Sequence, residues 1–497
     1  MNAPSLPAGP FRPDLLPDFA PLREVFRRAG YTEAALAKLF QGRNEQNVDL
    51  PVALLRTEAS TSFNTLARLF ALHLVVAEDG LRAAVAPVNL EQLFDTGMIE
   101  RVPDGVRATA QLSPWQELLL LNDFLPPEGE PMPADFVMSG ASPSSASLAA
   151  LTVRRRVASA LDLGTGSGSQ ALLLAAHAER VVATDANPRA LNFTQMNARL
   201  NGIENVSVAE GSFFEPVAGE RFDLIVCNPP FIVAPPSDLL FQGNSVGRDA
   251  VSERIVREAP AYLNEGGYAI SLVSWPHGGG EDWPARPRAW ASGTGCDAWV
   301  LRGSDDDPLS YAADALRQTE PVRSERYATM LSVWLAYYRA QNFVRLAMGA
   351  VLLRKRAGVR NWINFDVIPK AMHGNASDQI ERIFAAADLL ASIDRDEQLF
   401  ERRLALHTGH VIEQELLVKH DGWGIQAASL AAMHGIGFRA TLDGPVLTFL
   451  AQCDGTRTLR EAITAVAEGF EMDFPQVAEA ALPVVRRMLR NGMLVVS

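Results

Sequence analysis

The stretch Leu161-Asp-Leu-Gly-Thr-Gly-Ser-Gly168 ends a hydrophobic run in a glycine turn, and Phe222-Asp-Leu-Ile-Val-Cys227 ends another in Asn228-Pro-Pro-Phe231. Around them, apolar runs of strand length alternate with segments of helical spacing. This alternation is typical of a doubly wound α/β sheet. Ligands of such sheets bind at the carboxyl ends of strands where the strand order switches. We therefore expect a ligand site at the glycine turn.

The central segment accounts for most of the predicted sheet. We predict strands at 158–163, 180–184, 206–209, 222–227 and 268–273, with helices at 169–178 and 188–201. Further strands are predicted at 298–302, 347–354 and 362–367, the last two as a hairpin, with a helical insertion at 307–342. These elements predict a Rossmann-like doubly wound sheet.

The chain has 497 residues, which is too long for one core, and we predict three domains: 1–130, 131–370 and 371–497. The first has helical spacing near 20–41, 64–77 and 90–98 and then a strand-like run at 105–112, so we expect a winged-helix-like domain. Such a domain would dock substrate or only cover the core.

The third domain is predicted to be α+β and winged-helix-like at its end. Helical spacing occurs at 380–390, 459–467 and 477–489, and a strand is expected at 493–497. Pro483 either kinks the last helix or marks its start. The run 447–494 resembles small winged-helix domains that hold peptides in modified-peptide biosynthesis.

Charge and composition exclude several classes of function. The net charge is −13, with −6 in residues 1–130, −1 in 131–370 and −6 in 371–497, which disfavours tight nucleic-acid binding by either flank. No apolar stretch has the length of a membrane span, and the N-terminus lacks a secretion signal, so we expect a cytoplasmic protein. The three scattered cysteines predict neither a disulfide framework nor a zinc site.

A few basic and histidine residues are further candidates for ligand contacts. The clusters 154–156 and 354–356 could contact phosphates, but short basic clusters are more often solvated faces. His407, His410 and His420 match no metal pattern, and we interpret them as structural.

The glycine turn is the first candidate binding element. Gly164, Gly166 and Gly168 allow a tight turn and the close approach of a ligand. Asp185 follows Gly164 by 21 positions, near the offset of about 20 residues at which a carboxylate accepts two ribose hydroxyls. A nicotinamide dinucleotide is the alternative ligand, although Ser169 stands where the third glycine of that pattern would fall.

Residues 158–275 resemble the N-specific class I methyltransferases of the small-domain group, in their glycine turn, acidic strand end and Asn-Pro-Pro-Phe motif. The group includes the release-factor glutamine methyltransferases and the adenine-N6 and guanine-N2 methyltransferases of RNA. The resemblance implies S-adenosyl-L-methionine as cofactor. It assigns cofactor binding to these residues: Asp162, Gly164, Thr165, Gly166, Gly168, Asp185, Ala186, Ser212, Phe213 and Asn228.

Three of these assignments rest on particular positions of the pattern. Asp162 is expected near the methionine part of the cofactor. Ser212 stands where relatives have an aspartate that accepts from the adenine amine, and serine accepts more weakly. Phe213 is expected to pack on the adenine, and for one of Phe213 and Phe214 a plain core residue is an equally good interpretation. The segment 138–147 is expected to be a cofactor-proximal loop, or else a polar linker.

The Asn-Pro-Pro-Phe motif is the predicted catalytic element. The Asn228 side-chain oxygen and the Pro229 carbonyl can accept hydrogen bonds from both N–H groups of a planar nitrogen, which localises its lone pair toward the incoming methyl. Pro229 and Pro230 stiffen the turn, and Phe231 can stack on the flat target group.

Three functions remain open from the sequence. The stretch from 240–249 to 263–267 is most similar to the glutamine-modifying branch, so a protein or peptide glutamine or asparagine amide is the favoured substrate. That branch usually has tyrosine at the position of Phe231, where phenylalanine is common among the RNA enzymes. The second hypothesis is therefore a base methyltransferase of RNA or DNA. The third is a non-catalytic binding protein that retains the fold.

Overall fold

The computed structural model describes residues 9–42, 48–127, 130, 132–236, 249–278, 283–317, 320, 324–358, 360–369, 372–420 and 422–497. The chain forms two compact units. The first comprises Met1–Leu148, Arg156–Val300 and Ser304–Val359, and the second comprises Ala149–Arg155, Leu301–Gly303 and Arg360–Ser497. The predicted division into three domains stays a prediction.

The first unit is built around a mostly parallel sheet, as predicted. Its strands follow the order β10-β11-β9-β8-β5-β6-β7. Strands β5, β6, β7, β8 and β9 run parallel to one another, and β11 runs antiparallel to β9. The bounds are β5 (Val157–Leu163), β6 (Ala178–Asp185), β7 (Val206–Glu210), β8 (Phe222–Cys227), β9 (Leu263–His277), β10 (Cys296–Asp306) and β11 (Arg345–Lys355).

The strand order switches at β5. After β5 the chain adds β6 and β7 on one side and then returns to add β8 and β9 on the other. The register pairs Leu163 at the end of β5 with Thr184 on one side and with Cys227 at the end of β8 on the other. The loops that follow β5 and β8 therefore leave the sheet side by side.

The predicted hairpin of the last two sheet strands is wrong. β11 lies between β9 and β10, so both of its edges are occupied. β12 (Ile363–Val367) pairs instead with β10, and Ile368 N–H donates to the Arg302 carbonyl at 2.8 Å. A strand-like composition predicts a strand but not its partner, because pairing is decided by long-range packing.

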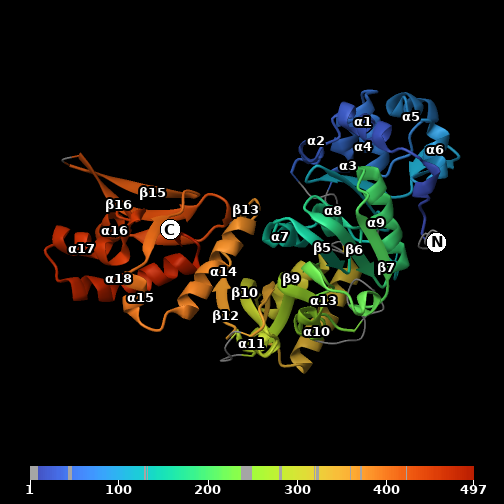
Figure 1. Cartoon of the computed structure of the whole chain (residues 1–497). Helices are drawn as coiled ribbons and strands as arrows, with labels where there is room; N and C mark the ends of the chain where they lie inside the picture. Colours follow the sequence, from blue (N-terminus) through green and yellow to red (C-terminus); the bar gives the residue numbers. More distant parts are fainter. Residues whose placement is uncertain are drawn as a thin grey trace. The chain divides into compact units, whose positions relative to one another are not determined.

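Helices connect the strands (Figure 1). The helix expected at 169–178 ends earlier, because Ala178 already pairs with Val157 as the first residue of β6. The insertion at 307–342 is helical in its described parts, as predicted. The helices are α7 (Pro143–Leu151), α8 (Ser169–Leu174), α9 (Pro188–Asn201), α10 (Ala250–Glu258), α11 (Ala285–Ala291), α12 (Pro308–Leu316) and α13 (Glu325–Ala340).

The N-terminal part of the first unit consists of helices followed by two hairpins, β1-β2 and β3-β4. Its winged-helix character stays a prediction. The elements are α1 (Ala20–Ala29), α2 (Glu33–Leu39), α3 (Leu50–Arg56), α4 (Ser62–Phe70), α5 (Glu78–Val85), α6 (Leu90–Asp95), β1 (Ile99–Val102), β2 (Gly105–Ala108), β3 (Gln111–Trp115) and β4 (Leu118–Asn122).

Helix α9 joins this N-terminal part to the sheet, and Figure 1 shows the N-terminal helices beside it. Phe193, Met196 and Leu200 of α9 belong to the same buried cluster as the N-terminal apolar residues. Two asparagines one turn apart bind the backbone of β4. Asn197 accepts from Leu121 N–H at 2.7 Å and donates to its carbonyl at 3.0 Å, and Asn201 makes the same pair of bonds to Leu119.

The second unit is α+β, as predicted. Its small sheets follow the orders β19-β14-β20, β15-β16-β18 and β13-β17. The elements besides β12 are β13 (Met372–His373), α14 (Ser377–Ser392), α15 (Asp396–Phe400), β14 (Arg403–Leu406), β15 (His410–Lys419), β16 (Gly422–Ala432), β17 (Gly435–Ile436), β18 (Arg439–Leu442), α16 (Gly444–Leu450), β19 (Asp454–Thr458), α17 (Leu459–Gly469), α18 (Phe474–Arg490) and β20 (Leu494–Val496).

Pro483 does not begin the last helix, since α18 starts at Phe474 and passes through it. Residues Val485, Met488 and Leu489 on one face of α18 are buried. Among the described residues, no helix combines the length and the apolar composition needed to cross a bilayer.

Replacing Asn197 by alanine should loosen the contact between α9 and β4. The substitution removes the partners of the Leu121 N–H and carbonyl, and an unpaired buried polar group costs about 1–3 kcal/mol. Hydrogen exchange at residues 118–122 should therefore accelerate about 10- to 100-fold. Arg199→Ala, on the exposed face of the same helix, is the control. Equal exchange in the two variants would contradict a structural role for Asn197.

Candidate functional site

The glycine turn after β5 forms one wall of the candidate site. Gly164, Gly166 and Gly168 all have positive φ, at +73°, +56° and +89°. A Cβ at Gly164 or Gly166 would meet no heavy atom within 4 Å, whereas one at Gly168 would lie 2.9 Å from the Thr194 side chain on α9. The first two glycines thus face open space, and the third allows close packing of helix against turn.

Asp162, at the end of β5, stabilises the glycine turn through hydrogen bonds. Its side chain is buried, and one carboxylate oxygen accepts from the Thr165 hydroxyl at 2.7 Å and from the Ala171 N–H at 2.9 Å. Burial raises the pKa of Asp162 to about 7, against the lowering effect of these two bonds. The contacts of Asp162 and Thr165 hold the turn onto α8. Direct binding of a ligand by either residue stays a prediction.

Asp185 ends β6 beside the same turn. One of its oxygens accepts from Gly166 N–H at 2.9 Å and the other from Asn187 N–H at 2.9 Å. Burial raises the pKa of this carboxyl, and hydrogen bonds from the backbone oppose the shift. A carboxylate has about four acceptor positions, so each oxygen can still accept a hydroxyl. Ala186, the next residue, is exposed.

The two phenylalanines after β7 have different surroundings. Phe214 is buried and stacks on Tyr262 with ring centroids 4.4 Å apart, which confirms that one of the pair is a core residue. Phe213 is half-buried, has a φ of +50°, and carries the Arg254 guanidinium 3.9 Å from its ring centroid. Packing of Phe213 on an adenine and hydrogen bonding by the half-buried Ser212 stay predictions.

The segment 138–147 packs directly on the glycine turn. A Cβ at Gly140 would lie 2.4 Å from the Ser167 hydroxyl and 2.9 Å from the Ser169 Cβ, so only glycine allows this approach. Gln170 of α8 donates to the Ser145 carbonyl at 2.9 Å. These contacts place the segment beside the turn, but only its first part is a loop, because helix α7 begins at Pro143. Its closeness to a cofactor stays a prediction.

The same segment orients Asn228, and the sequence did not predict this contact. The Asn228 amide nitrogen donates to the Ser144 hydroxyl at 3.2 Å and lies 3.5 Å from the Ser145 hydroxyl. Ser142, at the start of α7, positions both serines through bonds of 3.0 Å. With its nitrogen bound to the serines, the amide keeps its oxygen as an acceptor. The one available signal was the serine-rich composition of 139–147.

The Asn-Pro-Pro-Phe turn is held in place on both sides. Phe231 N–H donates to the Pro229 carbonyl at 2.7 Å, so one of the two lone pairs of that carbonyl is already used. Pro229 is buried, and Pro230 and Phe231 are half-buried. Pro229 can therefore accept only one further hydrogen bond.

Two tyrosines from the helical insertion bind the chain just after this turn. Val233 N–H donates to the Tyr311 hydroxyl at 3.0 Å, and the Tyr338 hydroxyl donates to the Val233 carbonyl at 2.6 Å. Both rings are buried in one apolar cluster with Val233. The insertion thus fixes the path of the chain that follows the motif, and no motif in the sequence indicated these two tyrosines.

The basic and histidine clusters named from the sequence have partners within the protein. Arg354 and Arg356 form ion pairs with the fully buried Asp297, at 2.7 and 2.9 Å, so they are structural rather than solvated. His410 contacts the His407 carbonyl at 3.0 Å. In the described part of the chain, no group of three or more His, Cys, Asp or Glu side chains is arranged to hold a metal ion.

Three segments of the chain match family models. Residues 142–281 match the methyltransferase small domain. The flanking segments 28–109 and 381–496 each match a domain of unknown function. The central segment that carries the candidate site is thus a methyltransferase small domain.

Curated proteins with similar sequences are glutamine methyltransferases by name. The chain is 40% identical over 139 residues to a release factor glutamine methyltransferase of Xylella fastidiosa, covering 25% of this chain and 48% of that protein. It is 35% identical over 145 residues to a ribosomal protein uL3 glutamine methyltransferase of Bradyrhizobium diazoefficiens, covering 26% and 45%. A putative protein N5-glutamine methyltransferase of Methanocaldococcus jannaschii is 34% identical over 122 residues, covering 23% and 60%.

The chain spans about half the length of the curated relatives it matches. Solved structures that match part of the chain include a methyltransferase from Pyrococcus furiosus, with 16% identity, a TM-score of 0.26 and coverage of 41% of this chain and 77% of that one. Another is Trm5b from Pyrococcus abyssi, with 17% identity, a TM-score of 0.30 and coverage of 52% and 62%.

The raised pKa of Asp162 predicts a pH-dependent loss of stability. Its carboxyl has a pKa of about 7 when folded and about 3.9 when unfolded, so the folded state holds its proton more tightly. This contribution to stability is fully present below about pH 4 and is lost as the pH rises to about 7, by on the order of 4 kcal/mol.

Asp162→Asn keeps the acceptor oxygen but cannot ionise, so it should lack this loss. The melting temperature of the variant should exceed that of the native protein by a margin that grows between about pH 4 and 7 and then stays constant. A margin that does not change with pH would contradict the assigned protonation.

Proposed function

We propose that the chain is an S-adenosyl-L-methionine-dependent N-methyltransferase that acts on a glutamine or asparagine side-chain amide of a protein or peptide. The observation that carries the proposal is the pairing of Leu163 with Cys227, which sets the glycine turn beside Asn228. The names of the curated relatives support both the reaction and the substrate class.

The residues around the glycine turn fit this cofactor. The space next to Gly164 and Gly166 is open, and Asp185 retains acceptor capacity for two ribose hydroxyls. Phe213 offers one ring face to an adenine while Arg254 covers the other. When bound, the cofactor supplies an electrophilic methyl group on a sulfonium sulfur.

Asn228 and Pro229 act on the nucleophile. An amide nitrogen is weakly nucleophilic because its lone pair is delocalised into the carbonyl. The Asn228 side-chain oxygen and the remaining lone pair of the Pro229 carbonyl accept its two N–H groups and localise that lone pair. The nitrogen would form a bond to the methyl group that the cofactor supplies and would release one proton to solvent. Because these acceptors are fixed before substrate arrives, the barrier to transfer falls.

The alternative substrate is an exocyclic amine of adenine or guanine in RNA or DNA. Phe231 favours it, because phenylalanine is common at this position among the RNA enzymes, and its half-buried ring can stack on a base. The acidic flanks and the relatives favour a protein. The segment 240–248, in which part of the resemblance to glutamine-modifying enzymes lies, is outside the described residues. A cytoplasmic location and a reaction without metal are parts of the proposal.

The test is transfer of labelled methyl from S-adenosyl-L-methionine into an extract of the native host that lacks this gene. The extract is divided between protease and nuclease before counting, and protease-sensitive label is expected. Asn228→Ala should lower the rate about 100-fold or more at any cofactor concentration, because an acceptor used in the transition state is lost. Asp185→Ala should recover when the cofactor concentration is raised, since its defect is in binding.

The other outcomes separate the competing functions. Nuclease-sensitive label would replace the amide by a nucleic-acid base as substrate. No label with either treatment, from a protein that binds the cofactor by calorimetry, would support the non-catalytic interpretation.

The serines that orient Asn228 should affect turnover without affecting cofactor binding. In Ser144→Ala/Ser145→Ala the Asn228 amide loses both hydroxyl contacts and can rotate, so kcat should fall about 10-fold with an unchanged cofactor Kd. The control is Ser147→Ala, whose exposed hydroxyl bonds to the Pro143 carbonyl in the same helix. A double variant with native kcat would exclude the positioning role.

A further inference from the structure

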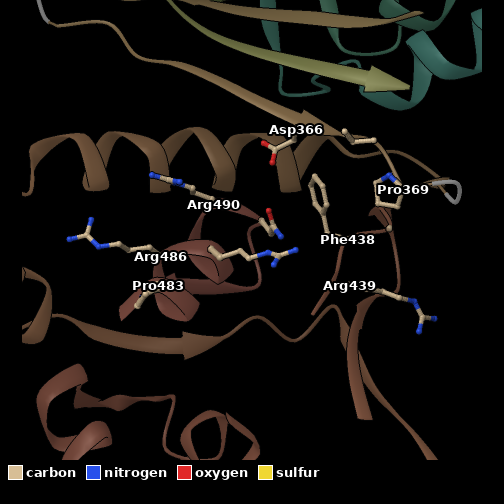
Figure 2. Close-up of a pocket in the computed structure, with 11 residues that line it drawn as sticks. Asp366, Pro369, Phe438, Arg439, Pro483, Arg486 and Arg490 are labelled. Carbon is tan, nitrogen blue, oxygen red and sulfur yellow. The ribbon is translucent and has the colours of Figure 1, made fainter. Parts of the chain in front are cut away.

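The second unit contains a groove of about 880 Å³ that the methyl-transfer site does not use. Its size is at the upper end of the range for ligand pockets, about 300–1,000 Å³. The groove lies between α18, the segment that includes the start of β18, and the end of β12 (Figure 2). All of its lining residues belong to the second unit.

Four arginines line the groove: Arg439, Arg486, Arg487 and Arg490. Arg439 forms an ion pair with Glu413 at 2.6 Å, and Arg486 forms one with Asp396 at 2.7 Å. Arg487 and Arg490 are exposed, and no ion pair joins either of them to another described residue. Because they are three positions apart on α18, they lie on the same face of the helix.

Apolar side chains separate the basic ends of the groove. Figure 2 shows Arg486 and Arg490 at one end and Arg439 with Pro369 at the other, and Phe438 lies between the two ends. Val367, which is 48% exposed, and Pro483 add to the apolar lining. An occupant that fits this pattern is elongated, with an apolar group flanked by negative charges.

A carboxylate also lines the groove, that of Asp366. It can accept hydrogen bonds from the N–H groups of a peptide backbone, whereas a phosphodiester backbone has no such donors.

We propose that this groove binds a peptide segment in which an apolar side chain is flanked by acidic ones. Arg487 and Arg490 bind a carboxylate at one end through charge-assisted hydrogen bonds, Arg439 attracts the carboxylate at the other, and Phe438 packs on the apolar side chain between them. This binding is independent of the proposed methyl transfer. Arginines in the last turn of a helix also stabilise its dipole, so binding must be measured directly.

The experiment uses the full chain and a fluorescein-labelled peptide of eight alternating glutamate and leucine residues. Fluorescence anisotropy at about 0.15 M salt gives its Kd, and a peptide with glutamine in place of glutamate is the control ligand. The glutamine peptide should bind about tenfold more weakly or worse. Arg487→Gln/Arg490→Gln should weaken binding of the acidic peptide by a similar factor.

The matched control is Arg402→Gln/Arg457→Gln, which removes the same charge from exposed positions of the second unit that do not line the groove. It should change the Kd less than about twofold. Circular dichroism establishes that each variant is folded. Equal binding of the two peptides, equal losses in the two double variants, or tighter binding of a labelled single-stranded RNA of eight nucleotides would each overturn the proposal.

Discussion

The register between β5 and β8 is the constraint on which the candidate site depends. Parallel pairing places Leu163 opposite Cys227, so the glycine turn and Asn228 leave adjacent strands at the same edge of the sheet. A shift of one residue would turn the side chains of β8 to the other face. The register is fixed because β8 is buried on both faces and lies between β5 and β9.

The rest of the first unit holds this edge in one arrangement. Helix α9 ties the N-terminal hairpin to the sheet, and its Asn197 also donates to the Ser167 carbonyl within the glycine turn. The insertion fixes Val233 through two tyrosines, and the serine-rich segment fixes Asn228. Elements that are far apart in sequence thus converge on the glycine turn and on the segment from Asn228 to Val233. Such convergence suits a reaction that depends on positioning.

The sequence predicted the elements of the fold better than their partners. Runs such as 222–227 became strands with the predicted bounds, because local apolar patterns specify strands and helices. The pairing of β12 was mispredicted, since a pattern does not encode its neighbour. The roles of Ser144 and Tyr338 could not be foreseen, because each acts on a residue more than 80 positions away. The motif residues themselves were recognisable because glycine and proline leave a local signature.

The central claim is that the cofactor binds at the end of β5 with its sulfur directed toward Asn228. The most direct test is an experimental structure of the full chain with S-adenosylhomocysteine, the demethylated form of the cofactor. The account predicts that the ribose hydroxyls lie on the Asp185 carboxylate, the adenine lies beside Phe213, and the sulfur faces the Asn228 side chain. A ligand bound away from Asp185, or one whose sulfur points away from Asn228, would contradict it.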